Sequence, residues 1–226
     1  MAVSKGGVSP PRYIRKSGVF EDKRTSRKQE VNKESRDALT DRLWTLYRKG
    51  ERMSYIEVQY PAEKPAFYQL LKEQIALYTG GEADRTAVLA NASAVIAQAF
   101  PDANWVGFYL TAGEELVVGP FQGKPAVSRI GYGRGVCGAA WRENRAQVVA
   151  DVSCFAGHIA CDCNTHSEIV VPLRRPDGSI WGVLDMDSVL SGHFTEEDRA
   201  GLEEIAALLY REGVVLTFPP PSSQYG

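Results

Sequence analysis

Two stretches with apolar residues at helical spacing open the compact part of the chain. In each, apolar side chains recur every three or four positions, which predicts an amphipathic helix with one buried face. The Gly80-Gly81 pair ends the first helix, and Pro101 follows the second. The buried stripes are Phe67, Leu70, Leu71, Ile75 and Tyr78 in the first helix, and Val88, Ala92, Val95, Ile96 and Ala99 in the second.

After Pro101 the pattern changes from a helical to an extended period. Short runs of aromatic and β-branched residues alternate with turn sequences, which is typical of β-strands. The predicted strands are 105–110, 116–121, 127–130, 147–150, 168–173 and 179–187, with a short helix over 136–143. A last helix begins at Thr195-x-x-Asp198, an acidic variant of the capping box, and its buried stripe is Leu202, Ile205, Ala206 and Leu209.

The turns between neighbouring strands favour a mostly antiparallel sheet. An Ala-Gly-Glu turn at 112–114 joins the first two strands, and an Arg-Pro-Asp-Gly turn at 175–178 joins the last two. Such tight turns connect antiparallel neighbours, whereas parallel strands need long crossovers. The order of elements therefore predicts an α+β fold in which helices pack on one face of the sheet.

Charge divides the chain into a basic start and an acidic body. Residues 1–50 hold 13 Lys and Arg against 6 Asp and Glu, while residues 51–226 hold 13 against 22. An acidic body does not suit nucleic-acid binding, and no stretch approaches the apolar length of a membrane-spanning helix. Because the chain opens without an apolar signal segment, we expect a cytoplasmic protein with no membrane partner.

The same shift in composition predicts three segments. Residues 1–33 are too polar to bury a core, so we expect a solvated arm there, followed by a short helix around 39–47. We predict a basic N-terminal extension over 1–60, one compact domain over 61–214 and a loose proline-rich tail over 215–226.

The cysteines are crowded into one part of the chain, which points to sulfur chemistry. Three of them lie in segment 151–165, which has no period, and a loop of that length in a compact domain is typically functional. Inert burial would explain any single cysteine but not their crowding. The four are Cys137, Cys154, Cys161 and Cys163.

A zinc site is another interpretation of this region. Cys161 and Cys163, with His158 and His166 on either side, are residue types that bind zinc. The Cys-x-Cys spacing is unusual for such a site, so we expect no bound metal and no other cofactor. A disulfide framework is disfavoured in a chain without a secretion signal.

Six motifs in fixed order give the chain a family resemblance. They span about residues 65 to 210 and are Asn104–Leu110, Gly119–Lys124, Gly133–Gly138, Gly157–Asp162, Ser167–Val170 and Gly182–Ser188. Together they resemble the free methionine-(R)-sulfoxide reductases, a family built on a GAF domain. The resemblance implies a GAF-like fold and an oxidoreductase that reduces free L-methionine (R)-sulfoxide to methionine.

The resemblance also implies how the cysteines act. It makes Cys161 the thiolate that attacks the sulfoxide sulfur, and Cys137 the partner that resolves the resulting sulfenic acid as a disulfide. Thioredoxin, or a similar dithiol protein, then reduces that disulfide. The family often carries another cysteine near the position of Val127. Its absence leaves open whether Cys137, Cys154 or Cys163 performs the recycling.

Three acids match the acidic residues of the family, namely Glu168, Asp185 and Asp187. Asp185 and Asp187 alternate along a predicted strand, so they face the same side. A carboxylic acid held protonated by like-charged neighbours can give the sulfoxide oxygen its proton, and carboxylates also hold the substrate's ammonium. The alternative is a strand end that faces solvent. We expect Trp105 and Tyr109 either to shape the pocket for the substrate's methyl group and sulfur or to lie in the sheet core.

A rival function comes from another class of protein. GAF domains are often sensors that bind a small molecule without chemistry, so a small-molecule, redox or metal sensor is the alternative. A sensor is usually joined to an output domain and does not need crowded cysteines beside acids. We therefore predict the reductase, with free methionine (R)-sulfoxide and thioredoxin as partners and a homodimer as an open option.

Overall fold

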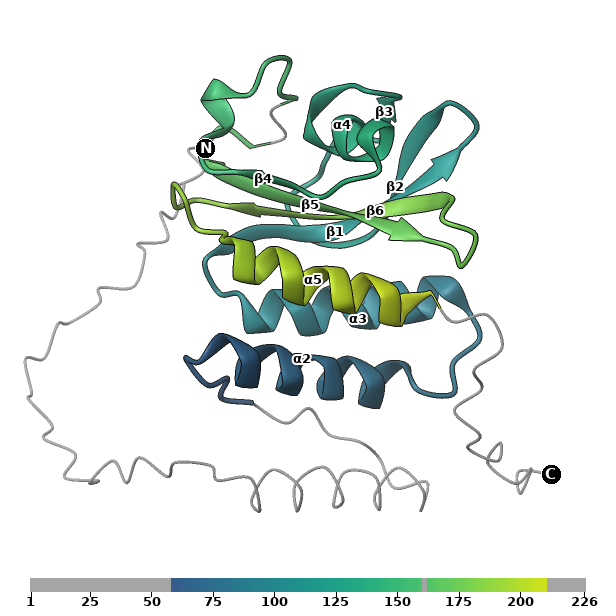
Figure 1. Cartoon of the computed structure of the whole chain (residues 1–226), viewed down its shortest axis with the longest axis vertical. Coiled ribbons are helices and arrows are strands. Elements are labelled where there is room, and N and C mark those ends of the chain that lie inside the picture. The colour runs from purple at the N-terminus through teal and green to yellow at the C-terminus, as the bar shows by residue number, and fades with distance from the viewer. Residues whose placement is uncertain (1–57, 160–161, 211–226) are drawn as a thin grey trace, which may run out of the picture.

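The computed structural model describes residues 58–159 and 162–210. In this part of the chain, six strands form one sheet in the order β3-β2-β1-β6-β5-β4, and every neighbouring pair is antiparallel (Figure 1). The strands are β1 Ala103–Ala112, β2 Glu115–Gly123, β3 Arg129–Gly131, β4 Gln147–Val149, β5 Ser167–Arg174 and β6 Ile180–Ser188. The predicted α+β fold with an antiparallel sheet is confirmed.

The described residues form α-helices on both sides of this sheet. They are α2 Lys64–Thr79, α3 Arg85–Ala99, α4 Gly135–Glu143 and α5 Glu196–Leu209. Figure 1 shows α3 and α5 against one face, α2 beyond them, and α4 on the opposite face. The three long helices therefore pack on one face as predicted, and the short helix α4 adds cover to the other. Within the described residues, every helix is too short or too polar to span a lipid bilayer.

Burial on both faces follows from the alternation of side chains along each strand. In β1, Val106 and Phe108 join the apolar cluster beneath the long helices, while Trp105 and Tyr109 join a second cluster beneath α4. The same alternation in β6 sends Leu184 and Met186 to the long helices and Val183 to the other face. From Val183 onward, the odd-numbered positions of β6 therefore face α4, and its two aspartates, Asp185 and Asp187, lie on that side.

Two predicted elements differ from the structure in detail. The strand predicted over 127–130 is found at β3, Arg129–Gly131, because pairing with β2 rather than apolar content decides where it begins. The segment predicted to be irregular over 151–165 contains a short 3₁₀ helix, η1 Val152–Cys154. The N-terminal arm, the helix around 39–47 and the proline-rich tail lie outside the described residues.

The capping box that opens α5 is part of a buried polar cluster. The Asp198 carboxylate accepts hydrogen bonds from the Thr195 backbone N–H at 3.0 Å and the Thr195 hydroxyl at 2.8 Å. Its other oxygen accepts from Lys64 Nζ at 2.6 Å and from the Tyr68 hydroxyl at 2.7 Å, so it also ties α5 to α2. One fully buried carboxylate therefore serves both a helix end and the contact between two helices.

We predict that Asp198→Ala lowers the free energy of unfolding by roughly 3 kcal/mol, because it leaves a lysine and a buried hydroxyl without their acceptor. Chemical denaturation followed by circular dichroism measures this change. The control is Glu204→Ala, which removes the exposed ion pair with Lys72 and should cost less than about 1 kcal/mol. Equal losses in the two variants would contradict a structural role for the buried cluster.

Candidate active site

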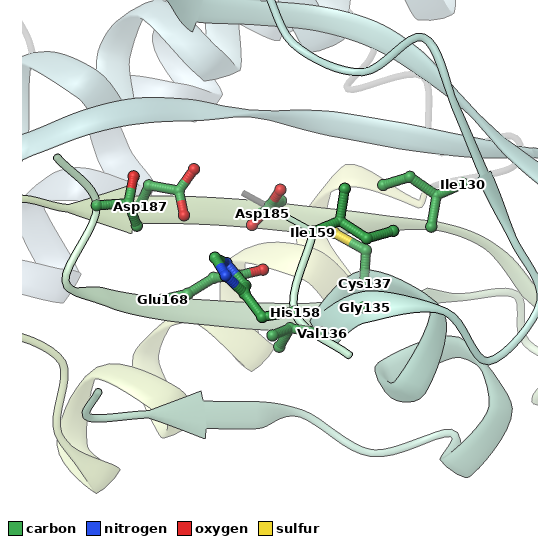
Figure 2. Close-up of a pocket in the computed structure, with 10 residues that line it drawn as sticks. Ile130, Gly135, Val136, Cys137, His158, Ile159, Glu168, Asp185 and Asp187 are labelled. Carbon is green, nitrogen blue, oxygen red and sulfur yellow. The ribbon is translucent and has the colours of Figure 1, made fainter. Parts of the chain in front are cut away.

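A pocket lies on the α4 face of the sheet, between the start of α4 and the loop that precedes β5. Residues from β3, α4, that loop, β5 and β6 surround it. Figure 2 shows these side chains converging from separate elements on one space. The lining residues are Ile130, Gly135, Val136, Cys137, His158, Ile159, Thr165, Glu168, Asp185 and Asp187.

Strand pairing brings the three predicted acids together. Glu168 of β5 lies directly opposite Asp187 of β6 in the antiparallel register. Asp185 is two residues further along β6, so it projects from the same face and lies diagonally from Glu168. All three are buried, with 6 to 7% of their surface exposed. The alternative of a solvent-facing strand end does not hold for these acids.

A glycine-rich turn sets the position of Cys137. Gly133 and Gly135 have positive φ values of 73° and 59°, a conformation that glycine adopts without strain. A Cβ on Gly138 would lie 2.8 Å from the Gly131 carbonyl oxygen, so only glycine allows α4 to pack this closely on the turn. Cys137 is the third residue of α4 and is therefore held, buried, at the pocket.

The thiol and two of the carboxyl groups form a tight cluster. Cys137 Sγ and one oxygen each of Glu168 and Asp185 all lie within 4.8 Å of one another. Asp185 Oδ1 is buried and has no hydrogen-bond partner within the described part of the chain. His158 Nε2 lies 3.4 Å from Glu168 Oε2, at the side of the cluster. The pocket therefore offers acceptor oxygens to a ligand that carries hydrogen-bond donors.

Burial shifts the protonation of these groups. It raises the pKa of Asp187 to about 8, with added repulsion from Asp185 and Asp162. Burial, and then the charge of the neighbouring acid, raises the pKa of Glu168 and of Asp185 well above the usual range. Burial also raises the pKa of the Cys137 thiol and lowers the pKa of His158. Burial therefore favours the protonated forms of the acids and of the Cys137 thiol.

A polar network holds the loop before β5. Asp162 accepts hydrogen bonds from Lys124 Nζ at 2.7 Å and from the Asn164 backbone N–H at 3.0 Å. The Asn104 amide nitrogen lies 3.4 Å from Asp162 Oδ2 and donates to Thr165 Oγ1 at 3.1 Å. The loop is thus anchored to the start of β1 and to the residue that follows β2.

Two predicted site residues lie beside the pocket rather than on its wall. Trp105 stacks on Phe121 and on Tyr109, with ring centroids 5.2 and 5.8 Å away, and none of these rings is among the pocket-lining residues. The Trp105 indole N–H donates to the Lys124 carbonyl, and the Tyr109 hydroxyl donates to the Val127 carbonyl. The aromatic stack therefore forms the core next to the pocket and braces the chain between β2 and β3.

The four cysteines of the sequence differ in position and exposure. Cys137 lines the pocket, Cys154 and Cys163 are exposed free thiols, and Cys161 lies outside the described residues. The described side chains form one group of three or more with metal-binding geometry, namely Cys137, Glu168 and Asp185. It differs from the zinc site that the sequence offered; of the described residues of that site, His158 alone lines the pocket.

The sequence analysis did not assign two polar residues of the pocket wall to the substrate site. It named His158 only as a possible zinc ligand, although this residue lies in the Gly157–Asp162 motif that carries the family resemblance. Thr165 lies in an aperiodic loop, where no pattern marks one polar residue above its neighbours. Only the folding of that loop against β5 and β6 brings Thr165 to the pocket.

The raised pKa of Asp187 predicts a pH-dependent stability. The folded state holds a proton on this group between its ordinary pKa of 3.8 and about 8, whereas the unfolded state has lost it. The free energy of unfolding should therefore fall as pH rises through this window, by at most about 1.4 kcal/mol per pH unit for one proton. Denaturant titrations at several pH values measure the slope, and Asp187→Asn should reduce it without abolishing it, because the pKa values of Glu168 and Asp185 are raised as well.

Asp177→Asn is the matched control for this prediction. Asp177 is exposed in the turn between β5 and β6, and hydrogen bonds from Ser179 lower its pKa. Its replacement should leave the slope above pH 5 unchanged, since the group is ionised in both states there. A slope that is the same in Asp187→Asn and in the unsubstituted protein would contradict the assignment.

Known proteins have the same fold and a similar sequence. The GAF domain family matches residues 82–211. The free methionine-R-sulfoxide reductase of Escherichia coli is 48% identical over 146 residues, which cover 65% of this chain and 88% of that protein. The free methionine-R-sulfoxide reductase of Saccharomyces cerevisiae is 40% identical over 156 residues, which cover 65% of this chain and 87% of that protein. The structure of free methionine-R-sulfoxide reductase from Neisseria meningitidis in complex with its substrate superposes with a TM-score of 0.63 at 43% identity, covering 68% of this chain and 93% of that one. The GAF-like prediction is confirmed, and the chain belongs to the free methionine-R-sulfoxide reductases, a family of oxidoreductases built on the GAF domain.

Proposed function

We propose that this protein reduces free L-methionine (R)-sulfoxide to methionine with a cysteine thiolate, by way of a sulfenic acid and a disulfide. One observation carries the proposal: the Cys137 thiol lies in a pocket with two buried carboxyl groups, all within 4.8 Å. The relatives named as reductases of this substrate support the same reaction. We also propose that the chain consists of an N-terminal extension over 1–60, a catalytic domain over 61–214 and a tail over 215–226.

The reaction balances with two thiols. The Cys161 thiolate attacks the sulfoxide sulfur while the oxygen takes up a proton, and the oxygen passes to the cysteine as methionine leaves. The product is a sulfenic acid on Cys161. The Cys137 thiol then attacks that sulfur, the oxygen departs as water, and a disulfide joins the two cysteines. A dithiol reductant finally restores both thiols.

The division of labour between these cysteines has physical support. Only a thiolate is a good nucleophile, and the raised pKa of Cys137 disfavours its thiolate for the first attack on the sulfoxide. In the second step the thiol proton can pass to the sulfenic oxygen, which leaves as water, so a protonated Cys137 is compatible with the resolving role. The described residues on either side of residues 160 and 161 lie at the pocket: Ile159 lines it, and the charge of Asp162 acts on Asp187. These neighbours support Cys161 as the attacking residue.

The three acids have two tasks in this reaction. A carboxylic acid that is protonated at neutral pH can donate to the departing oxygen, and the raised pKa values of Glu168, Asp185 and Asp187 favour that form. The positive charge of the substrate's ammonium favours the ionised form of whichever carboxyl it contacts. Within this proposal, Trp105 and Tyr109 act from beside the pocket by supporting the wall that meets the substrate's methyl group.

The reductant that fits this cycle is thioredoxin or a similar dithiol protein. The cytoplasm keeps such proteins reduced, so we place the reaction there. Val127, where the family often has a cysteine, lies in the segment between β2 and β3, and 36% of its surface is exposed. In this chain the reductant must therefore reduce the Cys161–Cys137 disulfide directly, because there is no cysteine at position 127 to pass the disulfide on. A homodimer is compatible with this scheme but not required by it.

The substrate range provides a first test. Because the buried acids would pair with a free α-ammonium, we predict turnover of free methionine (R)-sulfoxide and poor turnover of the (S) form and of a methionine-sulfoxide peptide. Oxidation of NADPH in the presence of thioredoxin and its reductase measures each rate. Equal rates on the free amino acid and the peptide would remove the proposed role of the acids.

The cysteines provide a second test. Cys161→Ser should abolish even one turnover, whereas Cys137→Ser should release about one methionine per enzyme and then stop as a sulfenic acid that dimedone traps. Cys154→Ser is the matched control, since Cys154 is exposed and outside the pocket lining, and it should cycle normally. Single-turnover release of methionine followed by mass spectrometry gives the result.

Two outcomes would change the assignment. A full single turnover by Cys161→Ser, with none by Cys137→Ser, would make Cys137 the attacking thiol. Sustained cycling by Cys137→Ser would show that Cys163 or Cys154 resolves the sulfenic acid, since both are exposed free thiols.

A further inference from the structure

Thr165 is a buried polar residue of the pocket wall that the proposed chemistry leaves without a task. It has 6% of its surface exposed and lines the pocket together with Glu168 and Asp187. Its backbone N–H donates to the Asp162 carbonyl, which closes the turn before β5 and fixes the residue in place. The side chain is therefore held at the pocket by its own backbone.

The amide of Asn104 determines how the Thr165 hydroxyl can bond. Asn104 lies at the start of β1, and its amide nitrogen is close to both Thr165 Oγ1 and the Asp162 carboxylate. The hydrogen bond from Lys124 lowers the pKa of Asp162, so this carboxylate is ionised and accepts only. The Asn104 NH₂ therefore faces this carboxylate, an orientation that leaves the buried Asn104 Oδ1 without a hydrogen-bond partner among the described residues.

This orientation leaves the Thr165 proton without an acceptor among the described residues. A hydroxyl has one proton to donate, and Thr165 Oγ1 already accepts a hydrogen bond from the Asn104 amide. Within residues 58–159 and 162–210, no hydrogen bond is donated by Thr165 Oγ1. A buried donor without an acceptor costs about 1 to 3 kcal/mol, so the position is most favourable when a ligand in the pocket supplies the acceptor.

A free amino-acid sulfoxide carries two such acceptors. Its α-carboxylate and its sulfoxide oxygen both need donors. A protonated acid of the pocket can serve one of them, while an ionised acid pairs with the ammonium. Thr165 lies on the same wall and adds a donor that does not depend on the protonation of the acids.

We propose that Thr165 binds the substrate by donating a hydrogen bond to one of its oxygens, and that Asn104 is a positioning residue that turns the Thr165 proton toward the pocket. The inference rests on the proposed function, because it assigns a further residue of the same site. The contacted group is an oxygen acceptor, either the sulfoxide oxygen or the carboxylate.

Paired substitutions at Thr165 test the hydrogen bond. Thr165→Val keeps the shape and removes the hydroxyl, and Thr165→Ser keeps the hydroxyl. We expect Thr165→Val to lower kcat/KM for free methionine (R)-sulfoxide by about tenfold or more, the effect of one lost hydrogen bond to a polar ligand. Thr165→Ser should stay within about threefold of the unsubstituted protein, and chemical denaturation checks that both variants are folded.

Binding of the product identifies the oxygen. L-methionine carries the carboxylate but no sulfoxide oxygen, so isothermal titration with L-methionine separates the two acceptors. If Thr165 contacts the carboxylate, Thr165→Val should weaken methionine binding and raise KM by similar factors. If it contacts the sulfoxide oxygen, methionine binding should be unchanged while the single-turnover rate falls. Either result supports the proposal.

Asn104→Ala tests the positioning role. Its loss of kcat/KM should be smaller than that of Thr165→Val and should vanish in the Thr165→Val background, because there is then no proton to orient. Additive losses would contradict the positioning role, because they would show that Asn104 does not act through the Thr165 hydroxyl. A Thr165→Val variant within about twofold of the unsubstituted protein, in both kcat/KM and methionine affinity, would overturn the inference. An inactive unsubstituted protein would instead remove the proposed function, and this inference with it.

Discussion

The antiparallel pairing of β5 with β6 is the constraint on which the site depends. It places Glu168 opposite Asp187 and Asp185 on the diagonal, on a sheet face that α4 and a loop cover. Three carboxyl groups buried this closely cannot all be ionised, so their pKa values are raised and protons are retained at neutral pH. Strand register, rather than any flexible element, therefore sets the acid–base state of the pocket.

The two faces of the sheet divide stability from chemistry. Beneath α3 and α5 the strands contribute apolar side chains to a continuous core, and the buried Asp198 cluster ties α5 to α2. The other face is covered by the nine residues of α4 and by loops, which leaves room for a pocket. The apolar core beneath α3 and α5 offsets the destabilisation that the buried acids cause on the other face.

The loop between η1 and β5 is held against the sheet by polar contacts. Ion pairing of Asp162 with Lys124 and the hydrogen bonds of Asn104 connect the loop to β1 and to the end of β2. His158 and Thr165, at opposite ends of the loop, both reach the pocket. A loop can thus present polar groups to a pocket when hydrogen bonds and an ion pair hold it to neighbouring strands.

Sequence patterns alone determined the order of helices and strands, the antiparallel sheet and the common face of Asp185 and Asp187, since these follow from local periodicity and short turns. They also marked Cys137 and Glu168 as candidates, through the motifs that carry the family resemblance. Only the tertiary structure decided that Trp105 and Tyr109 lie beside the pocket, that α4 covers the second face, and that Thr165 joins the acids. The physical reason is that periodicity reports which side of its own element a residue faces, whereas contacts between a loop and distant strands depend on long-range packing that no local pattern records.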